Sequence, residues 1–488
     1  MKLHVRAGLV SLVAAALGLC GPATAAASHH AVKPQIAIGP QARIATASTP
    51  ALTLFTCQVV NATPEDFTCY DPFQIRKAYG VDALVKGGYD GTGRTIVIVD
   101  AFQSPTLKDD VDTFASLYGL PGYDSFVKVV APDGMVAFDP NDPNMAGWSG
   151  EITLDVEWAH AIAPGAKVVL VLAKTNEDAD ILNALRYAVD HDLGDVISMS
   201  FGENESRVDP AGVAAYHDVF ASATRKGITL FASSGDQGAA QGTCDGRSWV
   251  KAVSHPASDP LVSGVGGTEL HAARYCLNAA EGCDPAHAPA AGTYSGEIAW
   301  NELLDTGTEA TGGGYSVLFD APPYQKSAVK SAGRAVPDVA YNAAIFHGVL
   351  TVWQGGVYLF GGTSAGSPQW AGITAIANQL AGKRLGYLNA AFYHIRQTPP
   401  NYGPSFHDVT IGDNSALELD ADGKVVQVKG FGASSAWDAT TGIGSPKAND
   451  LVYRMIQSVS PGDAMAAIAT SKPHGNGKPP KPGHMDPH

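Results

Sequence analysis

The sequence of 488 residues lacks the patterns typical of membrane proteins, nucleic-acid-binding proteins, zinc proteins and dinucleotide-binding enzymes. The apolar run at the N-terminus is too short for a membrane-spanning helix, and no later segment is apolar enough to cross a membrane. There are 32 Lys and Arg against 47 Asp and Glu, and the net charge of −15 argues against binding to nucleic acid or to an anionic membrane surface. No cysteine or histidine spacing is typical of a zinc site. Gly91-Thr92-Gly93 precedes an apolar strand instead of following one, so it is not a dinucleotide-binding turn.

Cysteine is also scarce, with six residues in the chain, and Cys20 belongs to the N-terminal apolar stretch. The other five are Cys57, Cys69, Cys244, Cys276 and Cys283. The first two and the last two are close in sequence, so two disulfides are expected in an oxidising compartment. Cys244 is then left over, or it replaces one member of the second pair.

Residues 1–26 have the features of a secretory signal peptide. Lys2 and Arg6 carry positive charge, residues 7–19 are apolar, and Ala23-Thr24-Ala25 is typical of a cleavage site. We therefore expect a secreted, extracellular protein with no membrane association once the signal is removed.

The rest of the chain has an even composition, with 45% hydrophobic residues and 54 glycines, which indicates one large, loop-rich domain over residues 67–458. Residues 27–66 are rich in Ala, Pro and Thr and predict a largely flexible leader or short pro-segment. The Pro-, Lys- and His-rich residues 459–488 predict a disordered tail.

Apolar strand-like stretches alternate with helix-like stretches through the first half of this domain. The predicted strands are 95–99, 126–130, 167–172, 196–201 and 228–233, and the predicted helices are 107–118, 151–162, 179–191 and 211–226. This order indicates an α/β fold of three layers, with a mostly parallel central sheet flanked by helices. Active sites in such sheets lie at the carboxyl ends of the strands. Asp100, Gly202, Asp236 and Ser364 all follow predicted strands.

Gly361-Gly362-Thr363-Ser364 connects the apolar strand 357–360 to a predicted helix over 365–380. The glycines allow a sharp turn, and the N–H groups at the start of a helix can stabilise an oxyanion beside an exposed hydroxyl. The sequence therefore predicts a nucleophile at Ser364, although Thr363 and Ser364 are also typical helix caps.

Two further stretches contain carboxyl groups that could take part in catalysis. Glu151 and Asp155 are four residues apart, so on a helix both lie on one face, where mutual repulsion makes one of them hold its proton. Asp236, in Ser233-Ser234-Gly235-Asp236, follows a strand, and when protonated it could donate a hydrogen bond to an oxyanion. A solvated helix face and an Asx-turn are the alternative interpretations of these two stretches.

Glu-x-x-x-Asp after a glycine, Ser-Ser-Gly-Asp and Gly-Thr-Ser-x-x-x-Pro, in this order, resemble the sedolisins, the serine-carboxyl peptidases of subtilisin-like fold. The resemblance covers residues 70–455. It implies a secreted, acid-acting serine endopeptidase that hydrolyses polypeptides through an acyl-enzyme on Ser364. Glu151 would be the general base and acid, Asp155 would orient it, and Asp236 would be the oxyanion donor. A carboxylate base suits acid, where a histidine is protonated.

The resemblance also bears on the substrate-binding strand, the N-terminal leader and the oligomeric state. Met199-Ser200-Phe201-Gly202 is similar to the strand that pairs with the substrate backbone, and relatives with Trp at the position of Phe201 carry an extra acid, which we do not expect here. The family usually has a long folded pro-domain, whereas residues 27–66 are short, and we expect this leader to be trimmed. No oligomer is implied, so a monomer is expected.

The family carries one structural Ca²⁺ near the C-terminus, held by an Asp-hydrophobic dipeptide and a later Gly-x-Gly-Trp/Tyr-Asp. The matching residues here are Asp408, Val409, Ser434, Ala436 and Asp438. Ser434 and Ala436 replace the two glycines, but these positions supply backbone carbonyls, so the oxygen ligands that Ca²⁺ prefers are retained. A turn without metal is the alternative.

Two other functions share parts of this pattern. One is a subtilisin-type Ser-His-Asp peptidase, but no His-Gly-x-His follows Asp100, and His160 points to another helix face than Asp155. Asp100 is better interpreted as a turn or cap residue. The other is a catalytically silent, calcium-stabilised secreted binding protein on the same scaffold.

Overall fold

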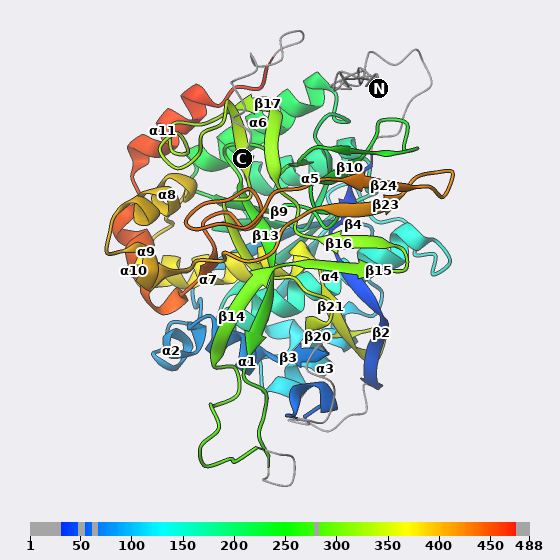
Figure 1. Ribbon diagram of the computed structural model, residues 1–488, viewed down its shortest axis with the longest axis vertical. Helices are drawn as coiled ribbons and strands as arrows, with labels where there is room; N and C mark the ends of the chain where they lie inside the picture. Colours follow the sequence, from blue (N-terminus) through cyan, green and yellow to red (C-terminus); the bar gives the residue numbers. More distant parts are fainter. Residues whose placement is uncertain (1–30, 47–53, 61–66, 278–282, 475–488) are drawn as a thin grey trace, which may run out of the picture.

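The computed structural model describes residues 31–46, 54–60, 67–277 and 283–474 (Figure 1). The predicted signal peptide, residues 1–26, lies outside the described residues. At the centre is an eight-stranded sheet in the order β14-β13-β9-β7-β4-β6-β5, with β19 also paired to β13. Its strands are β4 (Thr95–Ala101), β5 (Val127–Val130), β6 (Lys167–Ala173), β7 (Val196–Met199), β9 (Thr229–Ser233), β13 (Ser263–Ala272), β14 (Tyr294–Ala299) and β19 (Val339–Asn342). All its pairs are parallel except β13 with β14. The predicted α/β fold with a mostly parallel sheet is confirmed.

Helices cover both faces of this sheet because its strands are apolar on both sides. Along β4, Ile96 and Ile98 belong to one apolar cluster, while Val97 and Val99 belong to another. The first cluster is covered by α4 (Pro143–Ile162) and α7 (Gly366–Ala381), and the second by α5 (Asp178–Asp190) and α6 (Pro210–Arg225). The helix α3 (Leu107–Tyr118) packs on α4.

The helix α4 begins eight residues before the predicted start at Glu151. Asp142 caps it by accepting a hydrogen bond from the Asn144 N–H, and Pro143 occupies the first turn. Every residue from Trp148 to Ile162 is buried. Glu151 and Asp155 therefore lie in the middle of a buried helix and not in its first turn.

A second, four-stranded sheet, in the order β2-β21-β20-β3, leads into the turn that carries Ser364. Its strands are β2 (Ala37–Thr46), β3 (Thr68–Tyr70), β20 (His347–Trp353) and β21 (Gly356–Gly361). A three-stranded sheet joins β1 (Lys33–Pro34), β8 (Phe201–Asn204) and β12 (Ser254–His255). Parts of the leader that we predicted to be flexible thus form β1 and β2, since both pair with strands of the folded body.

The remaining elements surround these sheets. The remaining helices are α1 (Pro72–Ala78), α2 (Val81–Lys86), α8 (Asn389–Gln397), α9 (Tyr402–Ser405), α10 (Ala448–Ser458) and α11 (Pro461–Thr470). The remaining strands are β10 (Ala240–Gly242), β11 (Trp249–Lys251), β15 (Asn301–Leu304), β16 (Gly307–Ala310), β17 (Gly314–Asp320), β18 (Gly333–Val336), β22 (Phe406–His407), β23 (Ala416–Leu419), β24 (Val425–Val428) and β25 (Ser445–Pro446). Part of the tail predicted to be disordered forms α11, which packs on α6 and buries Ala467. In the described part of the chain, no helix has the length and apolar character needed to cross a membrane.

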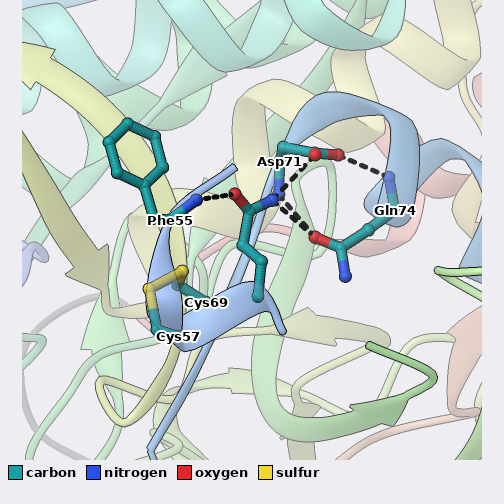
Figure 2. Close-up of a disulfide and its surroundings, with 6 residues drawn as sticks. Phe55, Cys57, Cys69, Asp71 and Gln74 are labelled. Atoms are coloured by element: carbon teal, nitrogen blue, oxygen red, sulfur yellow. Dashed lines mark hydrogen bonds between the residues drawn. A yellow bond between two sulfur atoms is a disulfide. The ribbon is translucent and has the colours of Figure 1, made fainter. Parts of the chain in front are cut away.

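Two of the disulfides are those expected from the sequence, Cys57–Cys69 and Cys276–Cys283. The first ties residues 54–60 to β3 (Figure 2). Beside it, the buried Gln58 side chain links three groups. Its carbonyl oxygen accepts from the Phe55 N–H, while its amide donates to Asp71 (2.8 Å) and Gln74 (2.9 Å). Cys244 is also disulfide-bonded, and no described cysteine is free, so the expectation of a left-over Cys244 is wrong.

Candidate active site

Ser364 lies in a single turn of 3₁₀ helix, Thr363–Ala365, between β21 and α7. The turn begins at Gly362, whose φ of 91° favours glycine. A side chain at this position would also meet the Asp236 carboxyl, since an added Cβ would lie 2.6 Å from its Oδ2. Glycine at 362 therefore lets the backbone beside Ser364 approach Asp236.

The Ser364 hydroxyl points at the side chain of Glu151 on α4. It donates a hydrogen bond to Glu151 Oε2 over 2.9 Å and lies 3.3 Å from the Ser200 carbonyl oxygen. Both side chains are fully buried. The structure thus brings the predicted nucleophile and the predicted base into direct contact.

Asp155 lies one helical turn after Glu151 and accepts a hydrogen bond from the Ser200 hydroxyl over 2.8 Å. Burial raises the pKa of both carboxyl groups well above the usual range, and the charge of Asp155 raises the pKa of Glu151 further. One oxygen of each, Glu151 Oε1 and Asp155 Oδ2, is buried without a donor among the described residues. Because each side chain has such an oxygen and the interaction with Glu151 lowers the pKa of Asp155, a proton held between the two groups fits this geometry.

Asp236 follows β9 and is held by the turn that carries Ser364. Its Oδ1 accepts from the N–H of Thr363 (2.8 Å) and from its hydroxyl (2.7 Å). Its Oδ2 is buried without a partner among the described residues, and burial raises the pKa of the carboxyl to about 7. Below that pH a protonated Oδ2 is a hydrogen-bond donor beside Ser364.

The interpretation of Asp100 as a turn or cap residue is wrong. Asp100 lies within β4 and is fully buried, and neither carboxyl oxygen has a partner in the described part of the chain. Burial raises its pKa to about 8, and its charge raises the pKa of Glu151 and of Asp155. The sequence did contain a signal for this burial. Asp100 ends an apolar strand of the kind that is buried on both faces, and a carboxyl group at such a position has no water to solvate it. An extra acid thus adjoins the Glu151–Asp155 pair although Phe201 replaces Trp.

His160 does not take part in this cluster. Its Nε2 lies 2.9 Å from the Pro121 carbonyl oxygen, and its ring stacks on Phe126 with centroids 3.6 Å apart. Burial lowers its pKa to about 4. The geometry gives a Ser-His-Asp relay through His160 no support.

The residues of the predicted calcium site meet at the turn 434–438. The Asp408 carboxylate accepts from the Ala436 N–H (3.0 Å), and the Asp438 carboxylate accepts from the Ser434 N–H (2.9 Å). Val409 beside them is buried. Two carboxylates next to the carbonyls of one turn are the hard oxygen donors that Ca²⁺ prefers, so the residues fit the ion. Ala436 has a φ of 78°, a conformation that favours the glycine the family carries there.

A second group of potential ligands lies on β13 and β20. Glu269, His271 and His347 place one ligand atom each within 4.8 Å of one another. Because imidazole nitrogens are poor ligands for Ca²⁺, this group is not the predicted calcium site.

Comparison with known proteins agrees with this geometry. The subtilase family model matches residues 134–397. The three-layer α/β arrangement with a mostly parallel central sheet is the subtilisin-like fold. The chain is 35% identical over 404 residues to kumamolisin from Bacillus sp. (strain MN-32), which covers 80% of this chain and 65% of that protein. It belongs to the sedolisin family, as the three sequence motifs predicted.

Two further relatives extend the comparison. Xanthomonalisin from Xanthomonas sp. (strain T-22) is 29% identical over 477 residues, or 90% of this chain and 51% of that protein. The solved structure of Pseudomonas sedolisin, a serine-carboxyl proteinase in complex with pseudo-iodotyrostatin, superposes with a TM-score of 0.66 at 26% identity. That match covers 81% of this chain and all of the solved one. The chain spans between half and two thirds of the length of the two curated relatives, kumamolisin and xanthomonalisin.

Proposed function

We propose that this chain is a secreted serine-carboxyl endopeptidase that hydrolyses polypeptides in acid through an acyl-enzyme on Ser364. The observation that carries the proposal is the hydrogen bond from the Ser364 hydroxyl to Glu151 Oε2. Membership of the sedolisin family supports the same chemistry.

In the first step Glu151 accepts the hydroxyl proton while Ser364 Oγ attacks the carbonyl carbon of the substrate. The Ser364 N–H and the protonated Asp236 Oδ2 stabilise the oxyanion. Glu151 then returns the proton to the leaving amine, and water hydrolyses the resulting ester by the same sequence. Asp155 shares a proton with Glu151, which orients Glu151 and leaves its Oε2 free to accept the proton of Ser364.

The carboxyl cluster also supports action in acid. Asp236 donates a hydrogen bond only below its pKa of about 7, and an ionised Asp236 would repel the oxyanion. Four buried acids, Asp100, Glu151, Asp155 and Asp236, cannot all be ionised in so small a volume. We infer that the active state is one in which most of them are protonated.

We further propose one structural Ca²⁺, held by the carboxylates of Asp408 and Asp438 and by backbone oxygens of Val409, Ser434 and Ala436. The ion would neutralise the two carboxylates and fix the turn 434–438. Secretion is proposed from the features of residues 1–26, and the disulfides support an oxidising compartment. No oligomer is needed to complete the site, so we propose a monomer.

The test compares wild type with Ser364→Ala and Glu151→Gln on a denatured protein substrate across acid and neutral pH. We expect wild type to cleave in acid and both variants to lose at least about a thousandfold in kcat/KM. The control is Ser367→Ala, which removes a buried hydroxyl three residues on that bonds Ser198 instead. Activity of Glu151→Gln within about tenfold of wild type would show that the base lies elsewhere.

A further inference from the structure

Residues of the N-terminal segment pass through the candidate active site in an extended conformation. β1 pairs antiparallel with β8, with Lys33 opposite Gly202 and Pro34 opposite Phe201. β2 begins at Ala37, opposite Gly361 of β21. Gln35 and Ile36, between these two pairings, therefore lie at Ser364.

The backbone of Gln35 makes the two hydrogen bonds that hold a peptide at a serine nucleophile. Its N–H donates to the Ser200 carbonyl oxygen over 3.1 Å, and its carbonyl oxygen accepts from the Ser364 N–H over 3.0 Å. An added Cβ at Gly362 would touch both this carbonyl oxygen and Asp236 Oδ2, so the two oxygens approach the same point. The Gln35 carbonyl thus occupies the place where an oxyanion would be stabilised.

We infer that the Gln35–Ile36 peptide bond is the first substrate of this chain, an inference that rests on the proposed peptidase function. Ser364 Oγ bonds to the Gln35 carbonyl carbon and its proton passes to Glu151. The C–N bond then breaks, and Glu151 gives the proton to the Ile36 nitrogen, which becomes a new amino terminus. Water hydrolyses the Gln35 ester, which regenerates Ser364 and leaves Gln35 with a free carboxylate.

The two products differ in how they are attached. The part ending at Gln35 is held by the short β1–β8 pairing and by the Val32 N–H, which donates to the Asn176 carbonyl. The part beginning at Ile36 continues into the longer β2–β21 pairing and is tied to β3 by Cys57–Cys69. Cleavage therefore releases the first part and opens the site, while β2 stays in its sheet.

The side chains of this segment also indicate a preferred substrate. The Gln35 side chain is buried, and its amide donates to the Gly202 carbonyl over 3.3 Å. On either side, Pro34 lies near Gly147 and Ile36 lies near Gly150, where α4 has no side chains. The site should therefore favour an uncharged amide before the cleaved bond and a branched apolar residue after it.

The first experiment follows the N-terminus of the full chain after exposure to acid near pH ~4, by mass spectrometry and N-terminal sequencing. We expect Ile36 as the new N-terminus in wild type and no cleavage there in Ser364→Ala. A different terminus, with intact activity on denatured protein, overturns this inference and leaves the proposed function standing. Absence of both cleavage and activity would instead refute the proposed function.

Two substitutions at one position test the bond itself. Ile36→Pro turns it into a bond to proline, and we expect its cleavage to slow at least about tenfold, while Ile36→Ala keeps the N–H and should be cleaved within about threefold of wild type. A synthetic peptide of residues 32–37 checks the result without relying on folding of the variants. It should be cut after Gln35, and at least about tenfold more slowly with Glu in place of Gln35; equal rates would contradict the proposed preference.

A separate observation concerns the group formed by Glu269, His271 and His347. Glu269 Oε1 lies 3.2 Å from His271 Nε2 and 3.7 Å from His347 Nε2. His347 Nδ1 lies 3.1 Å from the Leu270 carbonyl, which can only accept, so this nitrogen carries the proton and Nε2 presents its lone pair to the carboxylate. Two lone pairs facing each other are stabilised by a cation between them.

We propose that this group binds a divalent cation of the zinc type. Two imidazole nitrogens and one carboxylate oxygen are a ligand set that Zn²⁺ accepts, and the Leu270 carbonyl would orient His347 as such partners do in zinc sites. His271 is half-exposed, so an ion can enter from solvent.

Calorimetry with Zn²⁺ at about neutral pH tests this, in the Ser364→Ala background to prevent self-digestion. We expect His347→Ala to lose one Zn²⁺-binding site. The control is His287→Ala, which removes an exposed histidine elsewhere and should keep that site. Equal stoichiometry in the two variants, or displacement of the bound Zn²⁺ by an equal concentration of Ca²⁺, would overturn the proposal.

Discussion

The side chains of Ser364 and Glu151 are 213 positions apart in the chain and 2.9 Å apart in the folded protein. Their contact depends on the packing of α4 against α7 and the turn before it, on the same face of the central sheet. Because both residues are buried, the relation between the proposed nucleophile and the proposed base is set by core packing and not by surface loops.

Asp236 offers a test of the oxyanion donor. In Asp236→Asn the amide oxygen can still accept from Thr363, while the amide nitrogen replaces Oδ2 with a donor at every pH. We expect this variant to keep activity within about tenfold of wild type in acid and to extend it above pH ~7, whereas Asp236→Ala should lose about a hundredfold or more. Profiles of kcat/KM against pH measure both, and equal losses in the two variants would mean that Asp236 is structural.

The burial of Asp100 should make the free energy of unfolding larger in acid than at neutral or alkaline pH. Its folded pKa of about 8 lies above the ordinary value of 3.8, so the folded state binds the proton more tightly than the unfolded state. This stabilisation is fully present below pH ~4 and is lost as the pH rises to about 8, by about 6 kcal/mol for the single group. Urea unfolding at several pH values between these limits should show a much smaller decline in Asp100→Asn.

The control for this experiment is Asp124→Asn, which changes a carboxyl whose side chain is 81% exposed. Its unfolding curves should follow those of wild type at every pH. If Asp100→Asn also follows wild type, Asp100 does not titrate in this range.

If the proposed calcium site holds an ion, the stability of the protein depends on Ca²⁺. Asp438→Ala should lower the unfolding temperature in about 1 mM Ca²⁺ to that of wild type in chelator, and chelator should then have no further effect. Asp422→Ala, which removes an exposed carboxylate in another turn, should behave as wild type. Ala436→Gly relieves a left-handed conformation and should stabilise the protein by about 0.5–1 kcal/mol.

The Cys57–Cys69 disulfide closes a short loop, with the two cysteines 12 residues apart. The double variant Cys57→Ser/Cys69→Ser should lose about 3 kcal/mol of unfolding free energy, since the unfolded chain gains freedom. Denaturant unfolding measures the loss. A loss below about 1 kcal/mol would mean that the hydrogen bonds of Gln58 hold this segment without the covalent link.

Much of the fold could be predicted because the central strands and helices have strong, regular apolar patterns. The helix over 107–118 and the strand starting at Lys167 match the structure at the predicted residues. The rule that sites lie at carboxyl ends of strands also predicted that Asp236 and Ser364 lie near each other, as they do.

The predictions that were wrong depend on tertiary contacts, which a local sequence pattern does not reveal. The start of α4 was missed because Gly147 and Gly150 weaken a helical pattern, although both lie within the helix. The strands β1 and β2 have little periodicity of their own, since they are stabilised by pairing with β8 and β21. Asp100 resembled a cap because the burial of a strand end depends on the neighbouring strands.

The pairing of β2 with β21 has a practical consequence for anyone who produces this enzyme. If the Gln35–Ile36 bond is cleaved as proposed, an affinity handle fused ahead of Lys33 is lost with the first part, whereas one placed after α11 remains on the purified product. Recombinant expression should therefore use a C-terminal handle, and loss of an N-terminal one would serve as a simple visual assay of maturation on a gel.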